Sequence, residues 1–78
     1  MNWEQKNLRL HVANIIEART RLLVVMPPNQ GNWIVRIVTF DERGVPKTDF
    51  TGDHRDDGTY FVRLADAKAA AEAAVARS

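Results

Sequence analysis

The sequence predicts a small α+β domain, in which an antiparallel sheet of three or four strands carries an N-terminal helix and an alanine-rich C-terminal helix. Between residues 22 and 40, two runs of apolar, β-forming residues flank a turn-forming hexapeptide. Residues 1–26 contain no glycine or proline, and residues 65–76 are rich in alanine. The predicted order of elements is therefore α-β-β-(β)-β-α, where the strand in brackets is optional.

The 78 residues are expected to form one domain, residues 1–78. A chain of this size buries only about 60% of the surface that its unfolded form exposes, so its core is thin. Cysteine is absent, which excludes disulfides, thiolate metal ligands and cysteine nucleophiles. Eleven basic and ten acidic residues give a net charge of +1. No membrane span and no secretory signal are expected, and the expected location is the cytoplasm.

The first segment, residues 2–19, is predicted to be a helix. Asn2 is a suitable N-cap, with Gln5 at the N3 position. The apolar residues that follow have the spacing of one helix face: Leu8, Val12, Ile15 and Ile16.

A strand is the competing prediction for residues 7–19. Leu8, Leu10 and Val12 alternate with polar residues, as they do in a half-buried strand. The alternation ends at Asn14 and the period then breaks, which favours the helix.

Residues 22–26 and 33–40 are predicted to form a β-hairpin. Pro27 and Pro28 cannot donate to a ladder, so the first strand must end before them. Alternate residues of the second strand form two mostly apolar faces: Trp33, Val35, Ile37 and Thr39 on one, and Ile34, Arg36, Val38 and Phe40 on the other. This pattern is typical of a central strand that is covered on one face and partly covered on the other, with Arg36 on the wetter face.

Residues 41–58 contain three of the four glycines and are predicted to form turns at both ends of the segment. A short edge strand at residues 45–50 would avoid an unusually long loop without structure. Residues 59–63 are predicted to form a further strand, because they combine threonine, aromatic residues and valine.

Residues 64–77 are predicted to be a helix, because alanine has the highest helix propensity. Asp66 near its start and Arg77 near its end complement the helix dipole. A narrow stripe of mostly small residues would pack on the sheet: Leu64, Ala67, Ala71, Ala74 and Val75.

The acidic segment, residues 41–58, is the first candidate binding surface. It carries six acidic and three basic residues, so its net charge is −3. In this hypothesis a basic partner would contact Asp41, Glu42, Asp49, Asp53, His54, Asp56 and Asp57. The alternative is that aspartate and glycine simply form the turns, where both are favoured.

An arginine-lined surface is the second candidate, and it would bind nucleic acid. Its residues lie in or after the first segment and on the wetter face of the sheet: Arg9, Arg19, Arg21 and Arg36. Trp33 or Phe61 would offer a stacking surface for bases. The signature of an RNA-recognition motif is absent, and the balanced charge predicts only modest counterion release.

The sequence contains no recognisable catalytic or metal-binding motif. Its only serine, Ser78, is terminal, and no phosphate-binding or nucleophile-elbow motif is present. His11 and His54 lack the spacing of a zinc site, so His11 is expected on the surface of the first helix and His54 in an exposed loop. No metal, cofactor or enzymatic activity is therefore expected.

The leading hypothesis is a small non-catalytic protein-interaction module with a charged binding surface. In size and style alone, a hairpin followed by an alanine-rich helix resembles small bacterial and phage accessory proteins. This resemblance implies an inhibitor, encoded by a phage or mobile element, that binds a host defence complex. A nucleic-acid-binding accessory protein is the alternative. A homodimer that buries an apolar face of residues 33–40 is compatible with either.

Overall fold

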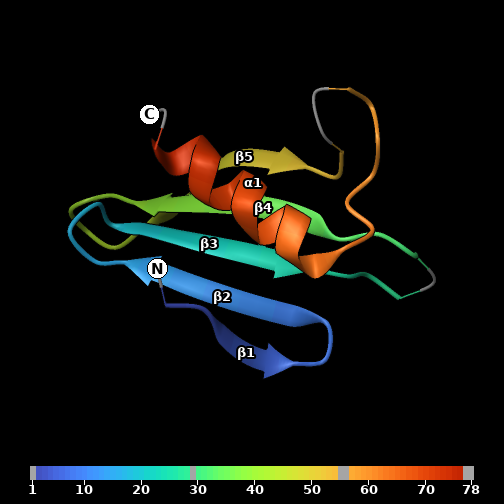
Figure 1. The fold of residues 1–78 in the computed structure, drawn as a ribbon. Coiled ribbons are helices and arrows are strands. Elements are labelled where there is room, and N and C mark those ends of the chain that lie inside the picture. Colours follow the sequence, from blue (N-terminus) through green and yellow to red (C-terminus); the bar gives the residue numbers. More distant parts are fainter. Residues whose placement is uncertain (1, 29, 55–56, 77–78) are drawn as a thin grey trace.

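The computed structural model describes residues 2–28, 30–54 and 57–76, and these ranges contain five strands and one helix (Figure 1). In chain order the elements are β1 (Glu4–Asn7), β2 (Leu10–Ile15), β3 (Thr20–Val25), β4 (Ile34–Phe40), β5 (Pro46–Gly52) and α1 (Leu64–Ala76). The strands form one antiparallel sheet in the order β1-β2-β3-β4-β5. The fold is therefore a five-stranded meander with α1 packed across one face.

The predicted N-terminal helix over residues 2–19 is wrong, because this segment forms the hairpin of β1 and β2. Asn7 starts the turn: its Oδ1 accepts a hydrogen bond from the backbone N–H of Arg9 at 2.8 Å. A local bond of this kind competes with helix formation. β2 then pairs with β3 over its whole length, so the competing prediction of a strand holds for Leu10–Ile15.

The central hairpin is confirmed as β3 and β4. As predicted, β4 has one buried face and one wetter face: Val35 and Ile37 are buried, whereas Arg36 is exposed. The predicted edge strand at residues 45–50 is present as β5, which is the last strand of the sheet.

The predicted strand at residues 59–63 is wrong. Within the described residues this segment makes two isolated bridges, Trp33 with Phe61 and His54 with Tyr60. The edge of β4 that it would need is already paired with β5. Phe61 is nonetheless buried, and its carbonyl accepts the N–H of Trp33 at 2.7 Å, which fixes the approach to α1 against the sheet.

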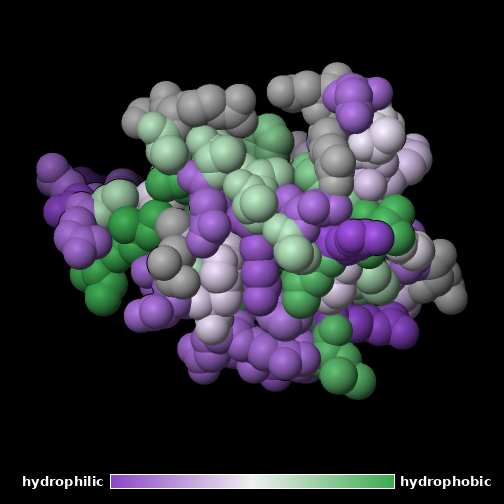
Figure 2. Space-filling model, viewed as in Figure 1, coloured by the Kyte–Doolittle hydropathy of each residue, from purple (hydrophilic) through white to green (hydrophobic). Residues whose placement is uncertain are grey.

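The predicted C-terminal helix is confirmed as α1, which packs against β3 and β4. The small side chains of Ala67 and Ala71 are fully buried, so the helix lies close to the sheet. The core between the two layers consists of Ala13, Leu22, Val24, Trp33, Val35, Ile37, Phe61, Ala67 and Ala71. On the helix side of the molecule, the pale green of the alanine-rich helix lies among hydrophilic residues (Figure 2).

Candidate functional site

The face of the sheet opposite α1, which we call the open face, is the main candidate site. Residues directly opposite each other on neighbouring strands share a face, so the strand register defines its members. In each of the following rows, the residues lie opposite one another on neighbouring strands of the open face: Asn14, Arg21, Val38 and Thr48; Glu4, Val12, Leu23, Arg36 and Thr51; Leu10, Val25 and Ile34; and Phe40 with Pro46. Among the described helices and strands, none lies over this face.

Aliphatic side chains form the floor of the open face. Five of these side chains are partly exposed: Leu10, Leu23, Val25, Ile34 and Val38. A sixth, Val12, is buried among its neighbours. A sheet that is covered on one side usually turns polar residues to the water on the other side. An apolar floor in that position is typical of an interaction surface.

Two exposed arginines lie among these aliphatic side chains on the open face. Arg21 lies on β3 opposite Val38, and Arg36 lies on β4 opposite Leu23. Among the described residues, neither guanidinium is within salt-bridge distance of a carboxylate. Glu4, the acidic residue that shares the face, already pairs with Lys6 at 3.0 Å. The open face therefore carries a surplus of positive charge beside its aliphatic floor.

Arg21 is held in position by its neighbours. Its Nε donates a hydrogen bond to Oδ1 of Asn14 at 2.9 Å, and its Cζ lies 5.3 Å from the centroid of the Phe40 ring. Arg19 and the 85% exposed Ile16 complete a shallow depression of about 300 Å³ around it. A guanidinium fixed through Nε and stacked on a ring keeps its terminal amino groups for a bidentate anion, either a carboxylate or a phosphate.

The structure brings together three of the four arginines proposed from the sequence. Arg19 and Arg21 line the same depression, and Arg36 lies on the same face. Arg9 lies instead in the turn between β1 and β2, at the opposite end of the strands. Sequence reasoning missed Asn14 and Phe40 as partners of Arg21, because they come from two other strands and only the strand register reveals the contact.

Among the described residues, the acidic side chains proposed from the sequence do not form one surface. Asp41 and Glu42 lie in the turn before β5, whereas Asp53, His54 and Asp57 follow it. A strand of this length separates its ends by roughly 20 Å. Asp49 lies in the middle of β5 on the helix side, and Asp56 lies outside the described residues.

Two of these acids stabilise the local turns. Oδ1 of Asp41 accepts the backbone N–H groups of Arg43 and Val45 at 2.8 and 2.9 Å. Oδ1 of Asp57 accepts the N–H of Thr59 at 2.9 Å. Such contacts account for aspartate at these positions even if it has no role in binding, and binding by the acidic segment stays a prediction.

The expected surface position of His11 is wrong, because this residue is 6% exposed on the helix side of β2. Desolvation and, to a smaller extent, the positive charge of Lys68 lower the pKa of His11. Among the described residues, no three histidine or carboxylate side chains are grouped to hold a metal ion. The one described helix is not long and apolar enough to cross a membrane. The candidate site rests on its geometry, since no family model, curated protein or solved structure matches the chain.

Proposed function

We propose that the protein is a non-catalytic interaction module whose open face docks on a protein surface that carries carboxylates. One observation supports this most directly: an aliphatic floor surrounds Arg21 and Arg36, and no described carboxylate neutralises either of them. Protein interfaces typically combine an apolar centre with enriched arginine. A phage- or mobile-element-encoded inhibitor of a host defence complex is one kind of protein that would work in this way.

Charge complementarity favours a different protein over a second copy of this chain. A two-fold dimer brings the same surface of both copies together. Dimerisation through the open face would therefore collect Arg21 and Arg36 from each copy in one apolar interface. Like charges in such an interface are strongly unfavourable, whereas aspartate or glutamate on a partner would form bidentate pairs with the same arginines.

Nucleic acid is the second candidate partner, and the depression around Arg21 favours it. Arg19 and Arg21 line this depression with Phe40, the one aromatic ring among the described residues of the open face. Surfaces that bind single strands usually offer several rings for stacking, along with a larger excess of basic residues. The aliphatic floor along Leu23 and Val38 suits a protein better than a polyanion, so protein is the preferred partner.

The test compares two charge-matched double variants in affinity capture from host lysate, followed by mass spectrometry. Arg21→Glu/Arg36→Glu reverses both charges on the open face. Arg9→Glu/Arg43→Glu reverses two exposed charges in turns elsewhere. Circular dichroism and urea unfolding establish that both variants are folded. We expect a nuclease-resistant protein partner that the open-face variant loses and the control variant retains.

Three other outcomes overturn the proposal. If the open-face variant retains the partner, the contact does not lie on this face. If the Asp53→Lys/Asp56→Lys/Asp57→Lys variant loses the partner instead, the result would support the acidic segment. Sedimentation that shows a dimer of wild type and a monomer of the open-face variant would identify a second copy as the occupant. Capture that requires intact nucleic acid would support the second candidate. If three arginines contact phosphates, affinity for a single-stranded oligonucleotide should fall about 20-fold between 50 and 200 mM salt.

A further inference from the structure

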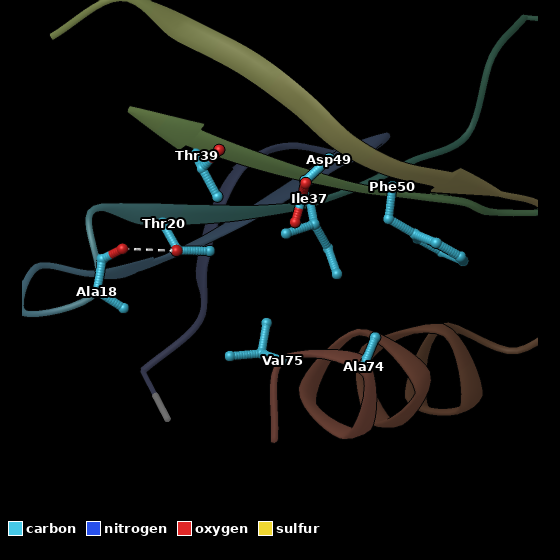
Figure 3. Close-up of a pocket in the computed structure, with 8 residues that line it drawn as sticks. All are labelled: Ala18, Thr20, Ile37, Thr39, Asp49, Phe50, Ala74 and Val75. Atoms are coloured by element: carbon cyan, nitrogen blue, oxygen red, sulfur yellow. Dashed lines mark hydrogen bonds between the residues drawn. The ribbon is translucent and has the colours of Figure 1, made fainter. Parts of the chain in front are cut away.

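A separate pocket lies on the helix side of the sheet, between α1 and the strands β3, β4 and β5 (Figure 3). Its volume is about 270 Å³. The lining consists of Ala18, Thr20, Ile37, Thr39, Asp49, Phe50, Ala74 and Val75. Figure 3 shows Val75 and Ala74 of the helix facing Ile37, Asp49 and Phe50 of the sheet across this space. The pocket is therefore an apolar slot into which one carboxylate projects.

A β-bulge places the carboxylate of Asp49 on the helix side of the sheet. Phe50 lies opposite Ile37, and Thr48 lies opposite the next residue, Val38, so Asp49 is the extra residue of β5. Without the bulge, Asp49 and Phe50 would point to opposite faces. With the bulge, both line the pocket on the helix side. Bulges often redirect a side chain next to a functional site.

The Phe50 ring forms an exposed wall of the pocket. The side chain is 46% exposed, which is high for a phenylalanine. Its ring lies over Gly52, where an added Cβ would be 2.9 Å from the ring Cζ. Glycine at this position therefore lets the ring rest against the strand, and a ligand in the pocket would cover it.

The electrostatics of the pocket favour a cation. Within the described residues, no basic group is within salt-bridge distance of Asp49. The hydroxyl of Thr20 is already used, since it donates to the carbonyl of Ala18 at 2.9 Å. Ala74 and Val75 belong to the C-terminal end of α1, which carries the negative end of the helix dipole.

From this geometry we infer that the pocket binds a small organic ammonium ion, whose charged nitrogen pairs with Asp49 while its apolar body packs between Phe50, Ile37 and the helix. The volume lies just below the range of about 300–1,000 Å³ for ligand pockets, so it suits a short aryl or alkyl amine. The inference does not depend on the proposed function, because the pocket lies on the other side of the sheet.

The test is titration of the full ¹⁵N-labelled chain with 2-phenylethylammonium, followed by NMR. We expect shifts of the amide signals of Thr39, Asp49, Phe50 and Val75, with a Kd of about 1 mM. 2-Phenylethanol, which replaces the ammonium by a neutral hydroxyl, should bind more weakly. Asp49→Asn should weaken the ammonium about fivefold and leave 2-phenylethanol unchanged, because it removes an exposed charge pair. The titration is repeated in an Arg77→Ala background, which removes the basic residue that follows α1 in the sequence.

A second pair of variants tests the location. Ala74→Leu places a larger side chain in the slot, whereas Ala73→Leu makes the same change on the exposed side of α1. Only Ala74→Leu should abolish the shifts. Equal binding of the alcohol and the ammonium, equal binding by Asp49→Asn and wild type, or the absence of localised shifts in both the wild-type and Arg77→Ala chains would each overturn the inference.

Discussion

The imidazole of His11 meets the indole of Trp33 edge-on, with ring centroids 5.6 Å apart and ring planes at 71°. Both side chains are buried on the helix side of the sheet. Burial there lowers the pKa of His11 from its ordinary value of 6.5, and the charge of Lys68 adds to this effect. Above pH 6.5 the native state therefore holds His11 mainly as a neutral ring.

This burial predicts a loss of stability in mild acid. Near and below pH 6.5 the unfolded chain binds more proton at His11 than the native chain does, so the free energy of unfolding falls as the pH drops from 6.5 toward the lowered native pKa. Urea unfolding at a series of pH values should show this slope in wild type and not in His11→Phe. Equal slopes in the two proteins would show that His11 titrates alike in both states.

The close approach of α1 to the sheet predicts that larger side chains are not tolerated there. Ala71 is 0% exposed, whereas Ala69 lies on the exposed side of the same helix. Ala71→Leu should lower the free energy of unfolding by about 1–3 kcal/mol through overpacking. Ala69→Leu is the control, since leucine and alanine have similar helix propensities. Chemical denaturation measures both, and equal effects would contradict the tight packing.

Adjacent leucines on β3 should differ sharply in their contribution to stability. Leu22 is 0% exposed in the core, and Leu23 is partly exposed on the open face. Leu22→Ala should cost about 2–5 kcal/mol, because it leaves a cavity. Leu23→Ala should cost about 1 kcal/mol, because it removes only a half-buried side chain. If Leu23→Ala is as damaging as Leu22→Ala in urea unfolding, the open face is not open in solution.

The turn between β4 and β5 requires a glycine. Gly44 has φ +78°, a conformation that side chains disfavour, and an added Cβ would meet no other atom within 4 Å. Gly44→Ala should therefore lower stability by about 1 kcal/mol through the backbone alone. Gly31→Ala is the matched control, because its Cβ also meets open space and its φ lies outside the positive range. Thermal unfolding that ranks Gly31→Ala as the worse change would contradict this description of the turn.

The centre of the sheet and the final helix were predictable, because their patterns are unambiguous. The period of two in residues 33–40 separated Arg36 from Val35 and Ile37, and the structure confirms this separation. The alanine-rich end could form little other than a helix. The first segment was misread because the Ile15–Ile16 doublet mimics helical spacing, although it marks the point where β2 ends and its turn begins. The Asx turn at Asn7 was the local signal that a strand hairpin forms here.

Longer-range features could not be read from local patterns. Residues 59–63 have the composition of a strand, but the edge of β4 with which they would pair is paired with β5. The acids of residues 41–58 are close in sequence, and β5 carries them apart. The contact of Arg21 with Asn14 and Phe40 depends on the register of three strands. Periodicity predicts the face on which a residue lies, and only the register tells which residues are its neighbours.

The meander order of the strands has a consequence for how the chain folds. Each strand pairs with the one that precedes it, so most of the sheet can form by successive hairpins, each on a timescale of about 1–10 μs. Local pairing of this kind is typical of rapid folding. α1 follows all five strands in the sequence, so it is synthesised after the sheet that it covers. Until α1 has emerged, the nascent sheet exposes Leu22, Val24 and Val35 as well as the open face, and this is the stage at which the protein is most prone to aggregate.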